Sequence, residues 1–138
     1  MKKCSVVYSA NRPSYDKSDC CVRALMVAGS CGYEQASAMF SAAGRVLNKD
    51  APVDVTDTVY IKWLGMRKVE SNCELAVFVV LNPRGRFILH RRGHAFALID
   101  GVVHDWDTGT FARTQVTRAW EMTELGMEKL KKAGALFA

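Results

Sequence analysis

Three side chains in this sequence, Cys20, His94 and Asp105, have the types and the setting of a nucleophile, a base and an acid that orients the base. A thiolate can attack a carbonyl carbon, and a neighbouring imidazole can take up and return the proton. A carboxylate bonded to one ring nitrogen fixes the tautomer and leaves the other nitrogen for the thiol. The chemistry favoured by this combination is acyl transfer through a thioester, provided that the fold brings the three together.

Cys20 lies where a helix is predicted to begin. Ser18 or Asp19 is a suitable N-cap, and Val22 and Leu25 then fall on one helical face. The dipole and the free N–H groups of a first helical turn stabilise a thiolate at this place. The same N–H groups can donate hydrogen bonds to an oxyanion beside the sulfur. Cys20 is therefore expected to be the nucleophile.

A β-hairpin is predicted around the turn Asp100-Gly101, which lies between two apolar runs. In a two-residue turn Ala97 faces His104, and side chains alternate between the faces of each strand. His94 and Asp105 then share one face as diagonal neighbours, while His104 points to the other face. A slip of one residue in this register would move Asp105 away from His94.

Two alternatives concern the neighbouring residues. Asp107 lies directly opposite His94 in the same register and competes with Asp105 as the group that orients the ring. Asp105 is preferred because Asp107 is closer to the frayed end of the hairpin. Cys21 and Cys31 are expected to be packing residues, since free cysteines are often small buried side chains.

The predicted elements give an α+β fold, with N-terminal helices packed on a C-terminal antiparallel sheet. Residues 1–138 are expected to form one domain. Helices are predicted from the cap at residues 18–19 to about residue 29, over 33–43, from a cap at 56–57 to 65, and over 123–132. Strands are predicted over 4–8, 87–90, 95–99, 102–106 and 115–120, and segment 71–82 is ambiguous between helix and strand.

Composition indicates a soluble globular protein, with 49% hydrophobic and 24% charged residues among 138. No apolar run is long enough to span a bilayer, and no secretory signal is recognisable, so a cytoplasmic location is predicted. The five cysteines form no disulfide framework and no zinc spacing, and no cofactor or metal is expected. The net charge of +5 is partly concentrated in residues 84–92. It is compatible with a solvated face or an acidic partner, and the absence of interleaved aromatic residues disfavours nucleic acid binding.

The order Cys, His, Asp, with a helix followed by an antiparallel sheet, resembles the papain-like superfamily of cysteine peptidases. The similarity is greatest to the C39 peptidases that process bacteriocins and to the NlpC/P60 hydrolases. Segments 19–25, 32–36, 93–105 and 118–120 resemble small uncharacterised proteins of phages and bacteria. This resemblance implies a papain-like fold, a catalytic triad of Cys20, His94 and Asp105, and a protein or peptide substrate, in the host cytoplasm if a phage encodes the chain.

One feature departs from the papain-like pattern, because those enzymes usually carry a glutamine shortly before the cysteine to complete the oxyanion hole. Residues 13–18 contain no glutamine. Ser14, Tyr15, Ser18 and the backbone N–H of Cys20 are the candidate donors in its place. The alternative is a catalytically weak or inactive papain-like fold that acts as a binding module for a host protein.

Overall fold

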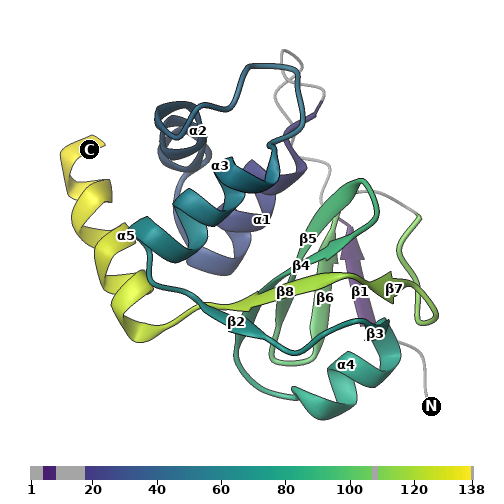
Figure 1. Cartoon of the computed structure of the whole chain (residues 1–138). Coiled ribbons are helices and arrows are strands. Elements are labelled where there is room, and N and C mark those ends of the chain that lie inside the picture. Colours follow the sequence, from purple (N-terminus) through teal and green to yellow (C-terminus); the bar gives the residue numbers. More distant parts are fainter. Residues whose placement is uncertain (1–4, 9–17, 107–108, 138) are drawn as a thin grey trace.

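The computed structural model describes residues 5–8, 18–106 and 109–137, and it has a mixed α+β architecture (Figure 1). The helical elements are α1 (Cys20–Gly29), α2 (Tyr33–Ala42), α3 (Val53–Asp57), the π-helical segment η1 (Thr58–Trp63), α4 (Leu75–Leu81) and α5 (Glu124–Phe137). The strands are β1 (Ser5–Tyr8), β2 (Arg67–Val69), β3 (Cys73–Glu74), β4 (Arg86–Arg91), β5 (His94–Ile99), β6 (Val102–Asp105), β7 (Gln115–Val116) and β8 (Arg118–Glu121).

Six strands form the main sheet in the order β1-β6-β5-β4-β8-β2, and β3 pairs with β7 in a small second sheet. The pairs inside the main sheet are antiparallel, as predicted, except that β1 runs parallel to β6. The prediction of a wholly antiparallel sheet is therefore wrong at this edge. Parallel neighbours need a long crossover, and here the chain between β1 and β6 contains most of the helices.

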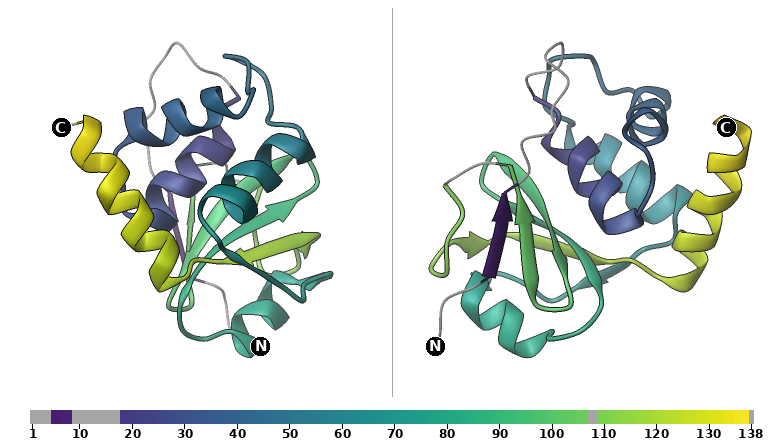
Figure 2. Two further views of the ribbon diagram at one scale, coloured as in Figure 1. Left: turned by 60° about the vertical axis from the view of Figure 1, so that its left-hand side comes forward. Right: turned by 180° about the vertical axis from the view of Figure 1, so that it is seen from behind.

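The helices cover the two faces of the main sheet unequally (Figure 2). Helices α1, α2, α3 and α5, together with η1, lie over one face, and α4 lies over the other (Figure 1). Each face has its own hydrophobic core. The first core contains Leu25, Phe40, Tyr60, Ile88, Ala97 and Trp120, and the second contains Leu75, Phe78, Phe87, Leu89, Phe96 and Leu98. Strands β4 and β5 contribute residues to both cores and are therefore covered on both faces.

The predicted hairpin is confirmed in both its turn and its register. Asp100 and Gly101 have φ angles of 47° and 81°, the left-handed region that an Asp-Gly turn requires. Ala97 faces His104 across β5 and β6, as the two-residue turn demands. The Asp100 carboxylate accepts a hydrogen bond from the N–H of Gly85 at 2.8 Å, which ties this turn to the one before β4.

The structure decides one ambiguous segment and corrects two local predictions. The ambiguous segment 71–82 contains the short strand β3 followed by α4. The third helix begins at Val53 after Pro52, three residues or more before the predicted cap, and continues into η1. Segment 115–120 is two strands, because β7 pairs with β3 in the small sheet whereas β8 pairs with β4 and β2 in the main sheet. None of the helices in the described ranges has the length and apolarity that crossing a bilayer would require.

Candidate active site

Cys20 is the first residue of α1, with Asp19 at the N-cap position, as the sequence predicts. The Asp19 carboxylate does not cap the helix. It accepts a hydrogen bond from the Tyr33 hydroxyl at 2.9 Å and lies 3.9 Å from Nε of Arg23. A bare carboxylate beside Cys20 would oppose a thiolate, so this ion pair removes an unfavourable charge from the helix start.

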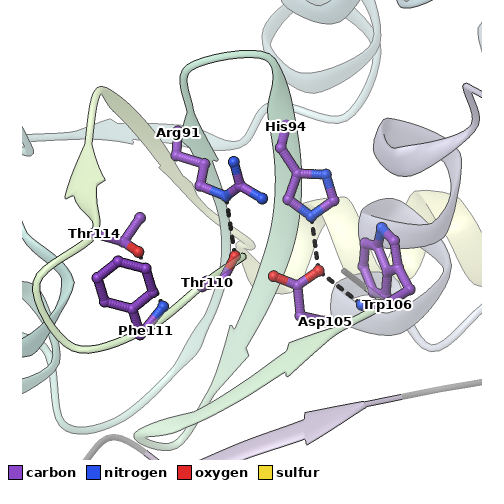
Figure 3. A network of polar contacts seen from close by, with 7 residues as sticks. All are labelled: Arg91, His94, Asp105, Trp106, Thr110, Phe111 and Thr114. Carbon is purple, nitrogen blue, oxygen red and sulfur yellow. Dashed lines mark hydrogen bonds and ion pairs between the residues drawn. The ribbon is translucent and has the colours of Figure 1, made fainter. Parts of the chain in front are cut away.

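His94 and Asp105 make the contact that the hairpin register predicts. Nε2 of His94 lies 2.7 Å from Oδ1 of Asp105, and Figure 3 shows the ring directed at the carboxylate from the neighbouring strand. The same oxygen accepts a hydrogen bond from the Trp106 N–H at 2.7 Å. Asp105 is completely buried, and the His94 side chain is only 8% exposed. A carboxylate so placed holds Nε2–H as a donor and fixes the tautomer of the ring.

The Cys20 side chain also acts on the His94 ring, and the two residues line the same cavity. Because Nε2 is occupied by Asp105, Nδ1 is the nitrogen that remains for the sulfur. Burial alone would lower the pKa of His94. The interactions with Asp105 and Cys20, and the negative charges of both groups, outweigh burial and raise that pKa from 6.5 to about 9. At neutral pH the ring is therefore an imidazolium, which can stabilise a thiolate and later donate a proton.

Thr110 and Arg91 form a second layer behind Asp105 that the sequence did not reveal. Nε of Arg91 donates to Oγ1 of Thr110 at 3.0 Å (Figure 3), and Thr110 acts on the Asp105 carboxyl by lowering its pKa. Burial raises the pKa of the Asp105 carboxyl, but the interactions with His94, Thr110 and the Trp106 backbone hold it below its usual value. Arg91 thus binds Thr110, and Thr110 and His94 both favour the charged form of the Asp105 carboxylate.

The loop that carries Thr110 is held in place by backbone hydrogen bonds. The N–H of Leu75 donates to the carbonyl of Thr114 at 2.7 Å, and the N–H of Ala76 donates to that of Ala112 at 2.9 Å. These bonds attach the loop to the first turn of α4. Thr110 lies in a loop five residues after Asp105 and has no periodic signature, so only the tertiary contacts of that loop identify it.

Trp106 covers the His94–Asp105 pair. Its ring lies edge-on to His94, with centroids 6.2 Å apart, and the Arg23 guanidinium lies over it at 5.3 Å. An aromatic ring at this position excludes water from the hydrogen bond between His94 and Asp105 and strengthens it. Arg23 therefore both pairs with Asp19 and packs on the Trp106 ring.

Cys20 and His94 line a cavity of about 390 Å³. Its walls come from the start of α1, the β4–β5 turn and β8. Its remaining lining residues are Cys21, Asp50, Ala51, Thr56, His90, Arg91, Arg92, Gly93, Ala95, Thr117 and Arg118. A larger hollow of about 780 Å³ lies between α1, α2 and α5, but neither Cys20 nor His94 lines it. The smaller cavity is the one that can hold a substrate against the sulfur.

The remaining candidates from the sequence are two further cysteines, the possible oxyanion donors and the competing acid. Cys21 is buried, and burial raises the pKa of its thiol to about 12, so it is a packing residue as expected. Burial also raises the pKa of Cys31, to about 11. Ser18 is half-buried beside the helix start, and its carbonyl accepts a hydrogen bond from Arg45 at 2.8 Å. The oxyanion candidates Ser14 and Tyr15, and the competing acid Asp107, lie outside the described residues.

Within residues 5–8, 18–106 and 109–137, no group of three or more His, Cys, Asp or Glu side chains is placed to hold a metal ion.

The pKa of His94 leads to a prediction about stability. A pKa that rises from 6.5 to about 9 on folding stabilises the protein fully below pH 6.5, and this contribution is lost as pH rises through 9. Folding lowers the pKa of Asp105, so the contribution of this group to stability is present at pH values above the carboxyl's ordinary pKa. That contribution is lost only in acid. We expect the free energy of unfolding to fall by on the order of 2–3 kcal/mol between pH 6 and 9.5, relative to His94→Gln. Urea unfolding at both pH values checks this, and equal pH dependence in the two proteins would contradict it.

Comparisons with protein-family models, with curated proteins and with solved structures find no match for this chain.

Proposed function

We propose that this chain is a thiol-dependent amide hydrolase of the papain-like type, a cysteine protease or amidase that works through an acyl-enzyme. One observation supports this most strongly. The His94 ring bonds to the Asp105 carboxylate through Nε2, and its pKa is raised by Cys20, which begins a helix and lines the same cavity. Three side chains from α1, β5 and β6 are thereby brought together, and two of them, Cys20 and His94, line the cavity.

The proposed reaction begins with a thiolate on Cys20 beside the imidazolium of His94. The Cys20 thiolate attacks the carbonyl carbon of an amide, and a bond forms between sulfur and carbon. The carbon–nitrogen bond then breaks while the His94 imidazolium gives its proton to the leaving amine. A water molecule, deprotonated by the now neutral His94, attacks the thioester. The sulfur–carbon bond breaks, a carboxylic acid leaves, and the thiolate–imidazolium pair is restored.

The oxyanion that forms in both steps needs hydrogen-bond donors beside the sulfur. The first-turn N–H groups of a helix lack partners within the helix, and Cys20 occupies that turn in α1. We propose the backbone N–H of Cys20 as one donor. Ser18 lies immediately before the helix and is a candidate for the second donor, in the place of the glutamine found in papain-like enzymes.

The order of elements is consistent with the papain-like assignment. The nucleophile begins the helix that packs against the central strands, and the base and the acid follow on adjacent strands of the sheet. The resemblance rests on this order and on the motifs of segments 19–25 and 93–105.

The test of the proposed function is the reactivity of Cys20 at pH 7. We expect iodoacetamide to alkylate Cys20 at least about tenfold faster than Cys21 or Cys31, because only Cys20 is paired with an imidazolium. His94→Ala should remove most of this difference. Alkylation is followed by intact mass and located by peptide mapping. In parallel, a panel of peptidyl aminomethylcoumarin amides is assayed for hydrolysis by wild type and Cys20→Ala.

The outcomes separate the candidate functions. Fast, His94-dependent alkylation together with Cys20-dependent release of the fluorophore supports the hydrolase. Slow and equal alkylation of the cysteines, unchanged by His94→Ala, would overturn it and favour a binding module with the same fold. Cys73→Ala is the matched control, since Cys73 lies in β3 outside the cavity and its loss should leave the alkylation of Cys20 unchanged.

A further inference from the structure

The cavity at Cys20 is lined mainly by positive charge. Arg91, Arg92 and Arg118 contribute to its walls, and Asp50 is the single carboxylate among the described lining residues. His90 also lines it but is neutral, because burial and the charges of Arg118 and His94 lower its pKa to about 3. The interior therefore presents guanidinium groups beside the place where an acyl group would bind.

The three arginines differ in how they are engaged. Arg91 donates to Thr110 and belongs to the layer behind Asp105. Arg118 has no ion pair with any described carboxylate, and its guanidinium lies 5.4 Å from the centroid of the Trp120 ring. Arg92 is exposed in the turn between β4 and β5, two residues before His94, and also has no ion pair among the described side chains. Two cations at this cavity are thus available to a ligand.

Arg118 is held in a fixed place by its neighbours. It faces His90 across the β4–β8 pair and is half-buried. Its charge acts together with burial to lower the pKa of His90. It also offsets part of the rise that burial causes in the pKa of the Tyr60 hydroxyl. Partial burial of a guanidinium without a carboxylate costs free energy that a bound anion would recover.

We propose, on the basis of the hydrolase function above, that the substrate is an acidic peptide whose carboxylate binds Arg118, assisted by Arg92, while its amide lies against Cys20. A guanidinium presents a planar fork that matches a carboxylate in a bidentate pair. The arginines lie within one cavity of about 390 Å³, which suits a single acidic side chain rather than the extended phosphate backbone of a nucleic acid.

The test uses two alkylating amides of nearly the same shape, chloroacetyl-glutamate amide and chloroacetyl-glutamine amide. They differ only in one charged group, so the ratio of their rate constants at Cys20 measures recognition of the carboxylate. In wild type at low ionic strength we expect the glutamate probe to react about fivefold faster, and the preference to shrink in 0.5 M salt, roughly as Debye screening requires. Arg118→Gln should bring the ratio close to one.

Two further variants keep the test decisive. Arg92→Gln changes an exposed turn residue and should lower the preference partly without affecting folding. Arg84→Gln removes the same charge at the opposite end of β4 and should leave the ratio as in wild type. A wild-type ratio of one, or a ratio unaltered by both Arg118→Gln and Arg92→Gln, would overturn the proposal.

The proposal and the function on which it rests fail in different ways. If the hydrolase function is wrong, both probes react slowly and His94→Ala changes neither rate. If only the acidic specificity is wrong, both probes react fast, in a His94-dependent manner, at equal rates. Salt-sensitive retention of duplex DNA that is lost in Arg118→Gln, with no probe preference, would assign the cations to nucleic acid and also overturn it.

Discussion

Replacing Asp105 with alanine is expected to lower the rate of Cys20-dependent amide hydrolysis by about 10³- to 10⁴-fold. The Asp105 carboxylate fixes His94 through Nε2 and keeps the pKa of the ring at about 9. Without it, the ring loses its orientation and its charge at neutral pH. The variant also leaves the Trp106 N–H without its buried acceptor, which costs about 1–3 kcal/mol.

Asp105→Asn separates orientation from charge and avoids most of this loss of stability. The asparagine oxygen can accept from both His94 and the Trp106 N–H, as Oδ1 does now. The tautomer is kept and the negative charge is lost, so we expect only about a 10- to 100-fold decrease in rate.

The measurements for this pair of variants are turnover of the best coumarin amide and the pKa of His94 by NMR. In Asp105→Asn the pKa should move down towards 6.5, and in Asp105→Ala the ring signal should show no fixed orientation. Equal rates in wild type and Asp105→Ala would mean that Asp105 has no part in the reaction, even if Cys20 proves reactive. Thr110→Val, which removes the hydroxyl that lowers the pKa of the same carboxyl, should have a smaller effect in the same direction.

The sequence predicts the hairpin and the start of α1 well because both depend on local backbone chemistry. Asp100 and Gly101 accept positive φ angles, and that turn alone determines the register that brings His94 to Asp105. The start of α1 follows from a polar residue before an apolar helical face, although Asp19 uses its carboxylate on Tyr33 rather than on the helix.

The parts that the sequence does not predict depend on distant contacts. The parallel pairing of β1 with β6 joins residues 5–8 to residues 102–105, and no local pattern indicates the direction of such a pair. Segment 75–81 forms a helix against the strand propensity of its valines, because Leu75 and Phe78 pack on the sheet from its second face. Thr110 and the cover provided by Trp106 likewise depend on tertiary position.

The largest loss of stability is expected for Trp120→Ala, at about 3–5 kcal/mol in the free energy of unfolding. The ring is fully buried in the first core. It contacts Tyr60 with centroids 4.9 Å apart and His90 with centroids 4.7 Å apart, so truncation leaves a cavity between η1 and the sheet. Phe111→Ala is the control, because Phe111 is 59% exposed and its loss should cost less than about 0.5 kcal/mol.

Trp120→Phe connects this core to the candidate site. The indole Nε1 has no hydrogen-bond partner among the described residues, so removing it leaves no acceptor unsatisfied, and the remaining ring still fills most of the space. We expect a cost below about 1.5 kcal/mol, measured by urea unfolding. A similar loss in Trp120→Phe and Trp120→Ala would contradict this packing.

Because Arg118 lies over the same ring, Trp120→Ala should also weaken the preference for the glutamate probe, while Trp120→Phe should preserve it. The aromatic core thus determines both the stability of the sheet and the position of Arg118, the cation that we propose binds the substrate carboxylate.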